Sequence, residues 1–467
     1  GRDTPPVSPN SIGLAVLPFV NISPDSKDEY IADGLTEELI TVLSQFRELR
    51  VISRTSAMLY KATPKSASQI GAELGVSSLL EGSVRKAGNR LRITAQLIEA
   101  RYDKHLWAKT FDRELDDVFA IQTEIARQVA EALRLELRPA EEARLESRPT
   151  ARPDSYLAYL RGLTLMRDYS VASLEAAQQQ FELAISHDPS NAGAYAGLAN
   201  STRFLAIWHW DPSRTDWVEK VRASATRALE LDPNLAEAHF GMTAPLFRDQ
   251  DYAGMEREFK LALSLDPSHA RAHCHYANLL EFVGRPEEAL AEFRLAEAAD
   301  PLWIANLNQL TWLLIMLRRL DEAWVTLEKI KAVAPADWVY HFGLADYFFA
   351  RSEVAKGLEA MRQAVELEPE GRGKQIDQAW MLARSGDSEG AKAILRLEET
   401  LPLFGQNPTF AALIHAELGD LDECFRWLDK SFLAHDLPIM FVRLDPRYEN
   451  VRRDPRYPAL LAKMNLA

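Results

Sequence analysis

Leu-Glu-Leu-Asp-Pro at residues 229–233 and Leu-Ser-Leu-Asp-Pro at residues 263–267 are two versions of one phrase that recurs along the chain. The prolines that close such segments are separated by 44, 34, 34, 34, 34 and 33 residues. They are Pro189, Pro233, Pro267, Pro301, Pro335, Pro369 and Pro402. Proline cannot donate a hydrogen bond inside a helix and it restrains the residue before it, so each one ends a helix. The stretch from about Ser155 to Asn450 is therefore an internal repeat.

A period of 34 residues with two short amphipathic helices per unit resembles the tetratricopeptide repeat. Small residues recur where the two helices of a unit would touch. In the unit closed by Pro301, Ala277 lies in the first helix, and Ala289 and Ala296 lie in the second. A helical hairpin this short cannot bury its apolar face alone, so its neighbours must stack on it. We expect seven or eight hairpins, ending near Leu461, that form a superhelix with a concave side.

Residues 11–138 have a mixed pattern that predicts an α/β domain, because period-2 and helical-period segments alternate there. The expected strands are Ile12–Val20, Arg50–Ser56, Ser78–Lys86, Arg90–Ala100 and His105–Phe111, and the expected helices are Glu29–Phe46, Ser68–Leu74 and Asp117–Leu137. The predicted fold class is an α/β domain followed by an all-α tetratricopeptide solenoid. We interpret residues 1–10 and 139–154 as linkers, and residues 155–467 as the repeat domain with a carboxy-terminal cap.

Two phrases of the α/β region carry a resemblance to a bacterial family. Leu-Ala-Val-Leu-Pro-Phe-Val-Asn-Ile-Ser at residues 14–23 and Tyr-Ile-Ala-Asp-Gly-Leu-Thr-Glu-Glu-Leu-Ile at residues 30–40 resemble the amino-terminal domain of TolB and FlgO. The segment Leu444–Tyr457 resembles the tail of the same proteins. In that family the pair of domains typically follows a class III nucleotide cyclase, a serine/threonine kinase or a winged-helix (CadC-like) regulator, often across one membrane span.

That resemblance implies a place for the chain in a longer signalling protein. The chain begins at Gly1 and its first ten residues have the composition of a linker, so we expect an upstream part that carries the effector. A membrane span upstream would favour a periplasmic location, and its absence a cytoplasmic one. The longest apolar run, Trp312–Leu317, is far shorter than the roughly 20 residues that span a bilayer.

Charge argues against nucleic acid as the partner. The net charge is −14, of which residues 1–140 contribute −1 and the remainder −13. Phosphate contacts need basic stripes, which an acidic solenoid lacks. Arg85, Lys86, Arg90 and Arg92 form a basic hairpin tip, but without interleaved aromatic residues a solvated turn is the better interpretation.

Catalytic and metal signatures are weak. No Walker A loop, G-x-S-x-G elbow, H-E-x-x-H helix or paired C-x-x-C occurs, so we expect neither an enzyme nor a cofactor. The best metal candidate is the group His269, His273, Cys274 and His275. However, His239 occupies the repeat position of His273, 34 residues earlier, and this periodicity favours packing over metal binding. Asp33, Glu37 and Glu38 open a predicted helix, where we expect them to complement its dipole and face water.

The repeat resemblance places the first helix of each unit on the concave side. Counting from the prolines, it implies these groove residues: Phe240, Asn278, Glu281, Asn308, Trp312, Phe342 and Asp346. Trp312 is either a binding anchor or a filler between stacked hairpins. The ten-residue surplus between Pro189 and Pro233 carries Trp208, Trp210 and Trp217, which either fold back onto neighbouring helices or offer an aromatic binding surface.

The function that the sequence favours is a non-catalytic sensing and protein-interaction region that binds a protein or peptide. Two alternatives from other classes stay open: an enzyme with a site between the two domains, and a structural envelope scaffold. A homodimer is also left open.

Overall fold

The structure is a computed structural model that describes residues 11–114, 118–146, 152–166, 170–208, 216–368, 372–400, 408–434, 439 and 442–466. The chain divides into two compact units. The first unit comprises Gly1–His273 and Ala298–Pro301, and the second comprises Cys274–Glu297 and Leu302–Ala467. None of the helices within the described ranges is long and apolar enough to cross a membrane.

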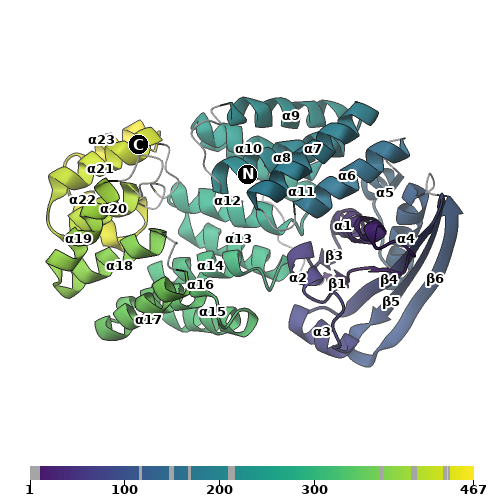
Figure 1. The fold of residues 1–467 in the computed structure, drawn as a ribbon, viewed down its shortest axis with the longest axis horizontal. Coiled ribbons are helices and arrows are strands. Elements are labelled where there is room, and N and C mark those ends of the chain that lie inside the picture. Colours follow the sequence, from purple (N-terminus) through teal and green to yellow (C-terminus); the bar gives the residue numbers. More distant parts are fainter. Residues whose placement is uncertain are drawn as a thin grey trace. The chain divides into compact units, whose positions relative to one another are not determined.

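A mixed sheet opens the first unit, in the strand order β3-β1-β4-β5-β6, with β2 beside β4 (Figure 1). Its strands are β1 (Ile12–Val16), β2 (Val20–Asn21), β3 (Leu49–Val51), β4 (Ser78–Ala87), β5 (Arg90–Glu99) and β6 (Lys104–Glu114). β1 runs parallel to β3 and β4, whereas β4, β5 and β6 are antiparallel. The helices of this region are η1 (Ser26–Asp28), α1 (Glu29–Ser44), α2 (Arg54–Met58), α3 (Ala67–Leu74), η2 (Ala100–Tyr102), α4 (Val118–Leu133) and α5 (Pro139–Glu146). Apolar residues of α1 and α4 share one core with the sheet.

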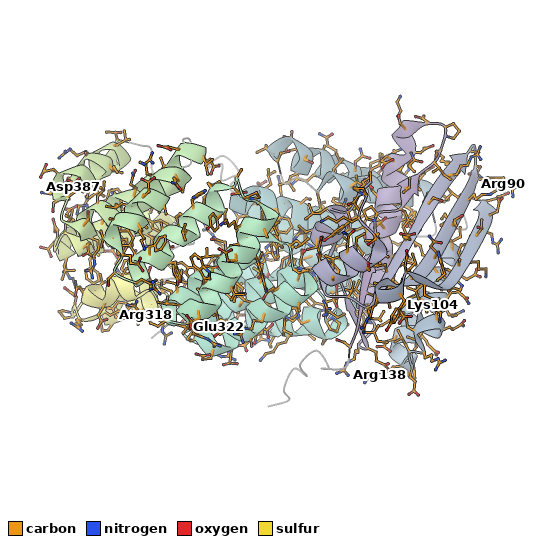
Figure 2. The ribbon with its side chains drawn as sticks, turned by 90° about the horizontal axis from the view of Figure 1, so that it is seen from below. Arg90, Lys104, Arg138, Arg318, Glu322 and Asp387 are labelled. Atoms are coloured by element: carbon orange, nitrogen blue, oxygen red, sulfur yellow. The ribbon has the colours of Figure 1, made fainter. Side chains whose placement is uncertain are left out.

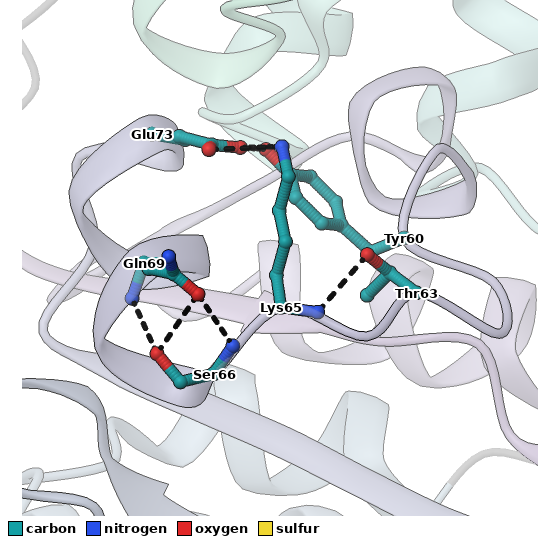
Figure 3. Close-up of polar contacts among 6 residues, drawn as sticks. All are labelled: Tyr60, Thr63, Lys65, Ser66, Gln69 and Glu73. Atoms are coloured by element: carbon teal, nitrogen blue, oxygen red, sulfur yellow. Dashed lines mark hydrogen bonds and ion pairs between the residues drawn. The ribbon is translucent and has the colours of Figure 1, made fainter.

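Helix α3 shows how local sequence sets an element. The Ser66 hydroxyl accepts a hydrogen bond from the Gln69 amide at 3.3 Å, and the Gln69 side chain accepts one from the Ser66 amide at 2.9 Å (Figure 3). This capping box satisfies two amides that the first turn leaves free. At the other end Gly75 adopts a left-handed conformation with φ of 65°. The predicted helix at Ser68–Leu74 is thus confirmed.

The strand predicted at Arg50–Ser56 is wrong in its second half. β3 ends at Val51, and α2 begins at Arg54. The Ser53 amide donates to the Ala299 carbonyl at 2.7 Å, and the Ser56 amide donates to the Asp300 carboxylate at 3.0 Å. The acceptors that start α2 therefore come from residues 298–301, which local propensity cannot reveal.

Helix α5 lies inside the segment that we interpreted as a linker. Its Leu145 joins the core of the sheet, and its Glu141 accepts from the Arg47 amide at 3.1 Å. The same core continues into the first repeat through Tyr156 and Leu160. The α/β region and the beginning of the repeats thus share one apolar interior.

The acidic residues at the start of α1 do not face water, which corrects our expectation. Asp33 is buried and pairs with Lys61 at 2.7 Å. Glu37 pairs with Arg54 at 2.7 Å. Glu38 is only 6% exposed and accepts a hydrogen bond from the Tyr159 hydroxyl at 3.1 Å. Burial of this face of α1 raises the pKa of Glu38 to about 7. The hydrogen bond from the Tyr159 hydroxyl lowers this pKa, but its effect is smaller than that of burial.

The basic tip of the β4–β5 hairpin is internally paired. Arg90, at the end of the sheet in Figure 2, and Arg92 bind the two oxygens of Asp112 at 2.8 and 2.7 Å. Lys86 pairs with Asp28 at 3.0 Å. These charges are part of a solvated network within the domain.

Paired helices make up the rest of the chain, as the 34-residue period predicted. The described residues contain the pairs α6 (Pro153–Leu165) and α7 (Val171–His187), α8 (Ala192–Trp208) and α9 (Trp217–Leu231), α10 (Ala236–Arg248) and α11 (Tyr252–Leu265), α12 (Ala270–Phe282) and α13 (Pro286–Ala299), α14 (Ile304–Met316) and α15 (Leu320–Val333), α16 (Trp338–Ala350) and α17 (Val354–Leu367), α18 (Arg372–Ser385) and α19 (Ser388–Glu399), and α20 (Pro408–Glu417) and α21 (Leu421–Ala434). The tail adds η6 (Pro446–Tyr448), α22 (Glu449–Arg452) and α23 (Tyr457–Lys463).

The repeat prolines mark helix ends. Helices α7, α9, α11, α13 and α15 all end two residues before a repeat proline, whereas Pro369 and Pro402 lie outside the described residues. The aspartates of this phrase form turns: Asp188, Asp232 and Asp266 accept from the amide two residues later at 2.9–3.0 Å. The alanines predicted at helix contacts are all fully buried: Ala277, Ala289 and Ala296.

We predict that Glu38→Gln stabilises the protein at high pH. The folded state holds the Glu38 proton up to about pH 7, whereas an unfolded Glu releases it near pH 4.5, so stability falls as pH rises between these values. Glutamine keeps the oxygen that Tyr159 needs and carries no charge, so the gain should reach about 3 kcal/mol at pH 8. Melting temperatures between pH 4.5 and 8 measure it. Exposed Glu48→Gln is the control, and an equal gain at every pH would contradict the prediction.

A second prediction concerns the start of α2. Asp300→Ala leaves the buried Ser56 amide without its acceptor, which should cost about 1–3 kcal/mol. Hydrogen exchange of residues 53–58 should accelerate accordingly. Asp232→Ala is the matched control, because Asp232 holds the same place in its repeat but, in the described structure, accepts from the local Asn234 amide. Unchanged exchange in the Asp300 variant would show that α2 does not depend on this carboxylate.

Candidate functional site

A cavity of about 140 Å³ lies within the second unit, between α14, α16, α20 and the tail. Its lining combines aromatic, amide and charged side chains. The lining residues are Asn308, Gln309, Trp312, Phe342, Asp346, Thr409, Phe410, Asp445, Arg447 and Tyr448. Four of the seven residues expected in the groove are among them.

Helical spacing explains how two helices supply these four residues. Asn308 and Trp312 are four residues apart on α14, and Phe342 and Asp346 are four apart on α16, so each pair shares one face of its helix. Most of α14 is buried, at Asn306, Leu307, Leu310, Thr311, Leu313, Leu314 and Ile315. Trp312 and Asn308 are half-buried and line the cavity.

The tail forms one wall of the cavity through a compact polar network. Arg447 Nη2 lies 2.7 Å from Asp445 Oδ2, and the guanidinium also stacks over the Trp380 ring at 5.0 Å. The Tyr448 hydroxyl donates to the Thr409 carbonyl at 2.6 Å. These contacts fix the charged residues of the tail against α18 and α20, so this wall is preorganised.

Asp346 is the ionisable residue whose pKa is clearly shifted in this cavity. Burial raises the pKa of its carboxyl to about 6; Asp445 adds to this rise, and Arg447 opposes it. No hydrogen bond or ion pair reaches Asp346 from the rest of the described chain. The site thus holds a carboxylate with a raised pKa and with no hydrogen-bond or ion-pair partner among the described residues.

Our sequence reasoning missed the wall that the tail provides, although the sequence contains a signal for it. Asp-Pro-Arg-Tyr occurs twice, at residues 445–448 and 454–457. In both copies the aspartate accepts from the arginine amide at 2.9 Å and pairs with its guanidinium. Both arginines stack on an aromatic ring, Arg447 on Trp380 and Arg456 on Phe425. A repeated phrase with a charge pair and a buried tyrosine indicates a structured cap, and one copy reaches the cavity.

The remaining groove candidates do not line this cavity. Phe240 is in the first unit, is 1% exposed, and packs beneath the Arg203 guanidinium at 4.1 Å. Asn278 and Glu281 lie on α12. Glu281 is 1% exposed, neither of its carboxylate oxygens has a hydrogen-bond partner in the described structure, and burial raises its pKa well above the usual range. Phe240 thus contributes to the core rather than to the cavity.

The insertion tryptophans are only partly described. Trp210 lies outside the described residues, and for Trp208 the structure describes only the backbone, at the end of α8. Trp217 begins α9 and packs against the buried group Ala199, Val221 and Ala225. Trp217 itself therefore packs onto its own helix pair, whereas most of the insertion lies outside the described residues.

The histidines serve the repeat geometry. His239 Nε2 lies 3.0 Å from the Pro233 carbonyl, and His273 Nε2 lies 3.1 Å from the Pro267 carbonyl, so both hold the same turn one repeat apart. His269 lies 3.3 Å from Glu237. The group whose geometry could hold a metal, within the described ranges, is instead Glu399, His415 and Glu423. Arg426 already pairs with both of its carboxylates, so the chain supplies a cation there itself.

Comparisons with known proteins match the two regions separately. Residues 10–128 match the family of the HilA/YgeH-like transcriptional regulator, second domain, and residues 270–294 and 375–396 match the tetratricopeptide repeat. The chain is 36% identical over 244 residues to "Putative adenylate cyclase 3" of Rhizobium meliloti (strain 1021). That match covers 52% of this chain and 42% of the relative, so the chain spans less than half of that protein.

Solved structures of repeat proteins are also similar. YrrB, described as a TPR protein with an unusual peptide-binding site, is 20% identical, with a TM-score of 0.31 over 41% of this chain and 93% of that one. Yeast Tom70 is 18% identical, with a TM-score of 0.40 over 76% of this chain and 83% of that one. The family matches and the helix pairs describe the chain as a HilA-like amino-terminal domain followed by a solenoid of tetratricopeptide repeats.

Proposed function

We propose that this chain is a non-catalytic sensing and protein-interaction region of a bacterial signalling protein, and that its partner binds as a peptide segment at the cavity of the second unit. The observation that carries the proposal is the convergence of Asn308, Trp312, Phe342 and Asp346. The repeat resemblance implies these four residues as groove residues, and all four line one cavity.

The signalling role draws support from the relatives of the chain. One is named as an adenylate cyclase and extends well beyond the matched region, and the amino-terminal family is named for a transcriptional regulator. The resemblance to TolB and FlgO points to the same kind of protein, in which an effector domain is joined to these two regions. A partner captured by the repeats would then influence an effector elsewhere in the full protein.

The binding energy would be concentrated at Trp312. Hot spots at protein interfaces are few, are often tryptophan, and lie in pockets that exclude water. Trp312 is half-buried beside Phe342 and Phe410, so a peptide side chain entering the cavity would complete its burial. Asn308, one helical turn away, offers an amide for a directional hydrogen bond.

We therefore expect Trp312→Ala to weaken peptide binding by about 2 kcal/mol or more without lowering the melting temperature. Peptides selected on the purified chain from a random display library provide the ligand, and titration calorimetry provides the affinity. Trp324→Ala is the matched control, since Trp324 is 37% exposed on α15, stacks on Tyr347 at 5.2 Å and does not line the cavity.

Three outcomes would contradict the proposal. A loss of stability of about 3 kcal/mol or more in Trp312→Ala would mark a core residue. Selected peptides that bind the variant as well as the wild type would place the partner elsewhere. Turnover of a nucleotide, ester, peptide or glycoside that a single carboxylate substitution abolishes would favour the enzyme alternative.

A further inference from the structure

The cavity of the second unit brings together three aromatic rings and one carboxylate that has no partner among the described residues. The rings belong to Trp312, Phe342 and Phe410, and the carboxylate to Asp346. Proteins use this combination to bind organic cations, because the face of an aromatic ring attracts positive charge and a carboxylate completes the pairing.

Size limits the ligand to a single side chain or head group. A cavity of about 150 Å³ holds a molecule such as benzene, whereas sites for whole small molecules enclose roughly 300–1,000 Å³. The cavity here measures about 140 Å³. One side chain of a peptide fits this space, and a nucleotide does not.

Charge decides which side chain it is. Asp445 and Arg447 neutralise each other through their 2.7 Å contact, and Arg447 is further engaged by the Trp380 ring. The other lining residues, apart from Asp346, are neutral. When Asp346 is ionised the cavity thus carries one net negative charge, which repels an acidic side chain. An uncharged apolar side chain would bury this carboxylate further without compensation.

The second unit already contains cations that pack on aromatic rings and pair with carboxylates. Lys430 lies 3.9 Å from the centre of the Trp427 ring, Arg456 lies 4.3 Å from that of Phe425, and Arg447 lies 5.0 Å from that of Trp380. In two of these cases a carboxylate also pairs with the cation: Asp454 with Arg456 and Asp445 with Arg447. The cavity offers the same two components, but among the described residues no cation forms an ion pair with Asp346.

We propose that the cavity is a pocket for a basic side chain of the partner peptide, with its cation paired to Asp346 between the rings of Trp312, Phe342 and Phe410. Arginine should bind more tightly than lysine, because its planar guanidinium both stacks on rings and forms two parallel hydrogen bonds to a carboxylate. The side-chain oxygens of Asn308 and Gln309 supply further acceptors. This inference rests on the proposed function and adds the chemical class of the anchor residue.

Binding should depend on pH through Asp346. Burial and Asp445 raise the pKa of Asp346 to about 6 against the opposing effect of Arg447, and these are the charged groups that face it. Below pH 6 the carboxyl is protonated and offers no charge to the cation. Affinity should therefore rise as pH increases from 5 to 7.5, by about tenfold, and then level off.

The test uses four blocked tripeptides that differ only in the central residue: arginine, lysine, norleucine and glutamate. Dissociation constants are measured by ligand-observed NMR at pH 5.0 and 7.5. We expect the arginine peptide to bind at least tenfold more tightly than the norleucine peptide at pH 7.5, lysine to lie between them, and glutamate to show no binding. Equal binding of norleucine and arginine would overturn the proposal.

Variants assign the effect to Asp346. Asp346→Asn should weaken binding of the arginine peptide at least tenfold and abolish the pH dependence of this binding. Asp346→Glu keeps the charge and should retain part of the affinity. Asp321→Asn, an exposed aspartate on α15 outside the cavity, is the matched control. Arginine binding that is the same in wild type and Asp346→Asn, with matching thermal melts, would overturn the proposal.

The two proposals fail separately. If library peptides lose affinity in Trp312→Ala but tolerate both Asp346→Asn and replacement of their basic residues, the cavity is a peptide site and the basic anchor is wrong. If no peptide depends on Trp312, the proposed function itself is wrong.

Discussion

Close contact between helices at alanine is the constraint on which the repeat array depends. Each hairpin is short and has little apolar surface of its own. Its two helices must therefore approach closely enough to form one shared apolar core. Ala225, Ala228, Ala262, Ala323 and Ala364 are fully buried in the second helices of four hairpins, and a larger side chain there would force the helices apart. The large aromatic residues Phe259 and Phe293 fill the adjoining space. The regular proline ends then fix where each next hairpin begins.

This arrangement explains why the repeats could be predicted from sequence while parts of the α/β region could not. The repeats are defined by local periodicity, and so are α3 with its capping box and the β4–β5 hairpin. By contrast, α2 depends on acceptors at residues 299 and 300, and α5 is held by a contact between Glu141 and the Arg47 amide. Contacts between residues so far apart leave no pattern in a short window of sequence.

The candidate site also has one part that follows from local sequence and one part that depends on contacts between distant residues. The repeat resemblance, counted from the prolines, implied the four residues that α14 and α16 contribute to the lining of the cavity. It could not predict that α20 and the tail close the cavity around them. The raised pKa of the half-buried Asp346 and the buried acidic face of α1 were missed for a related reason: whether a carboxylate meets water or protein depends on which elements cover it.

The contact of α2 with residues 298–301 has a consequence for the order of events during synthesis. The Ser56 amide and its acceptor Asp300 are 244 residues apart. Translation adds about 5–20 residues per second, so the acceptor emerges on the order of 10–50 s after the donor. During this interval the sheet can assemble, but the chain after β3 has no fixed partner for its free amides. The amino-terminal domain is therefore completed only when the fourth hairpin has been translated. A fragment that ends at residue 138 would lack the acceptors at residues 299 and 300 for the amides at the start of α2.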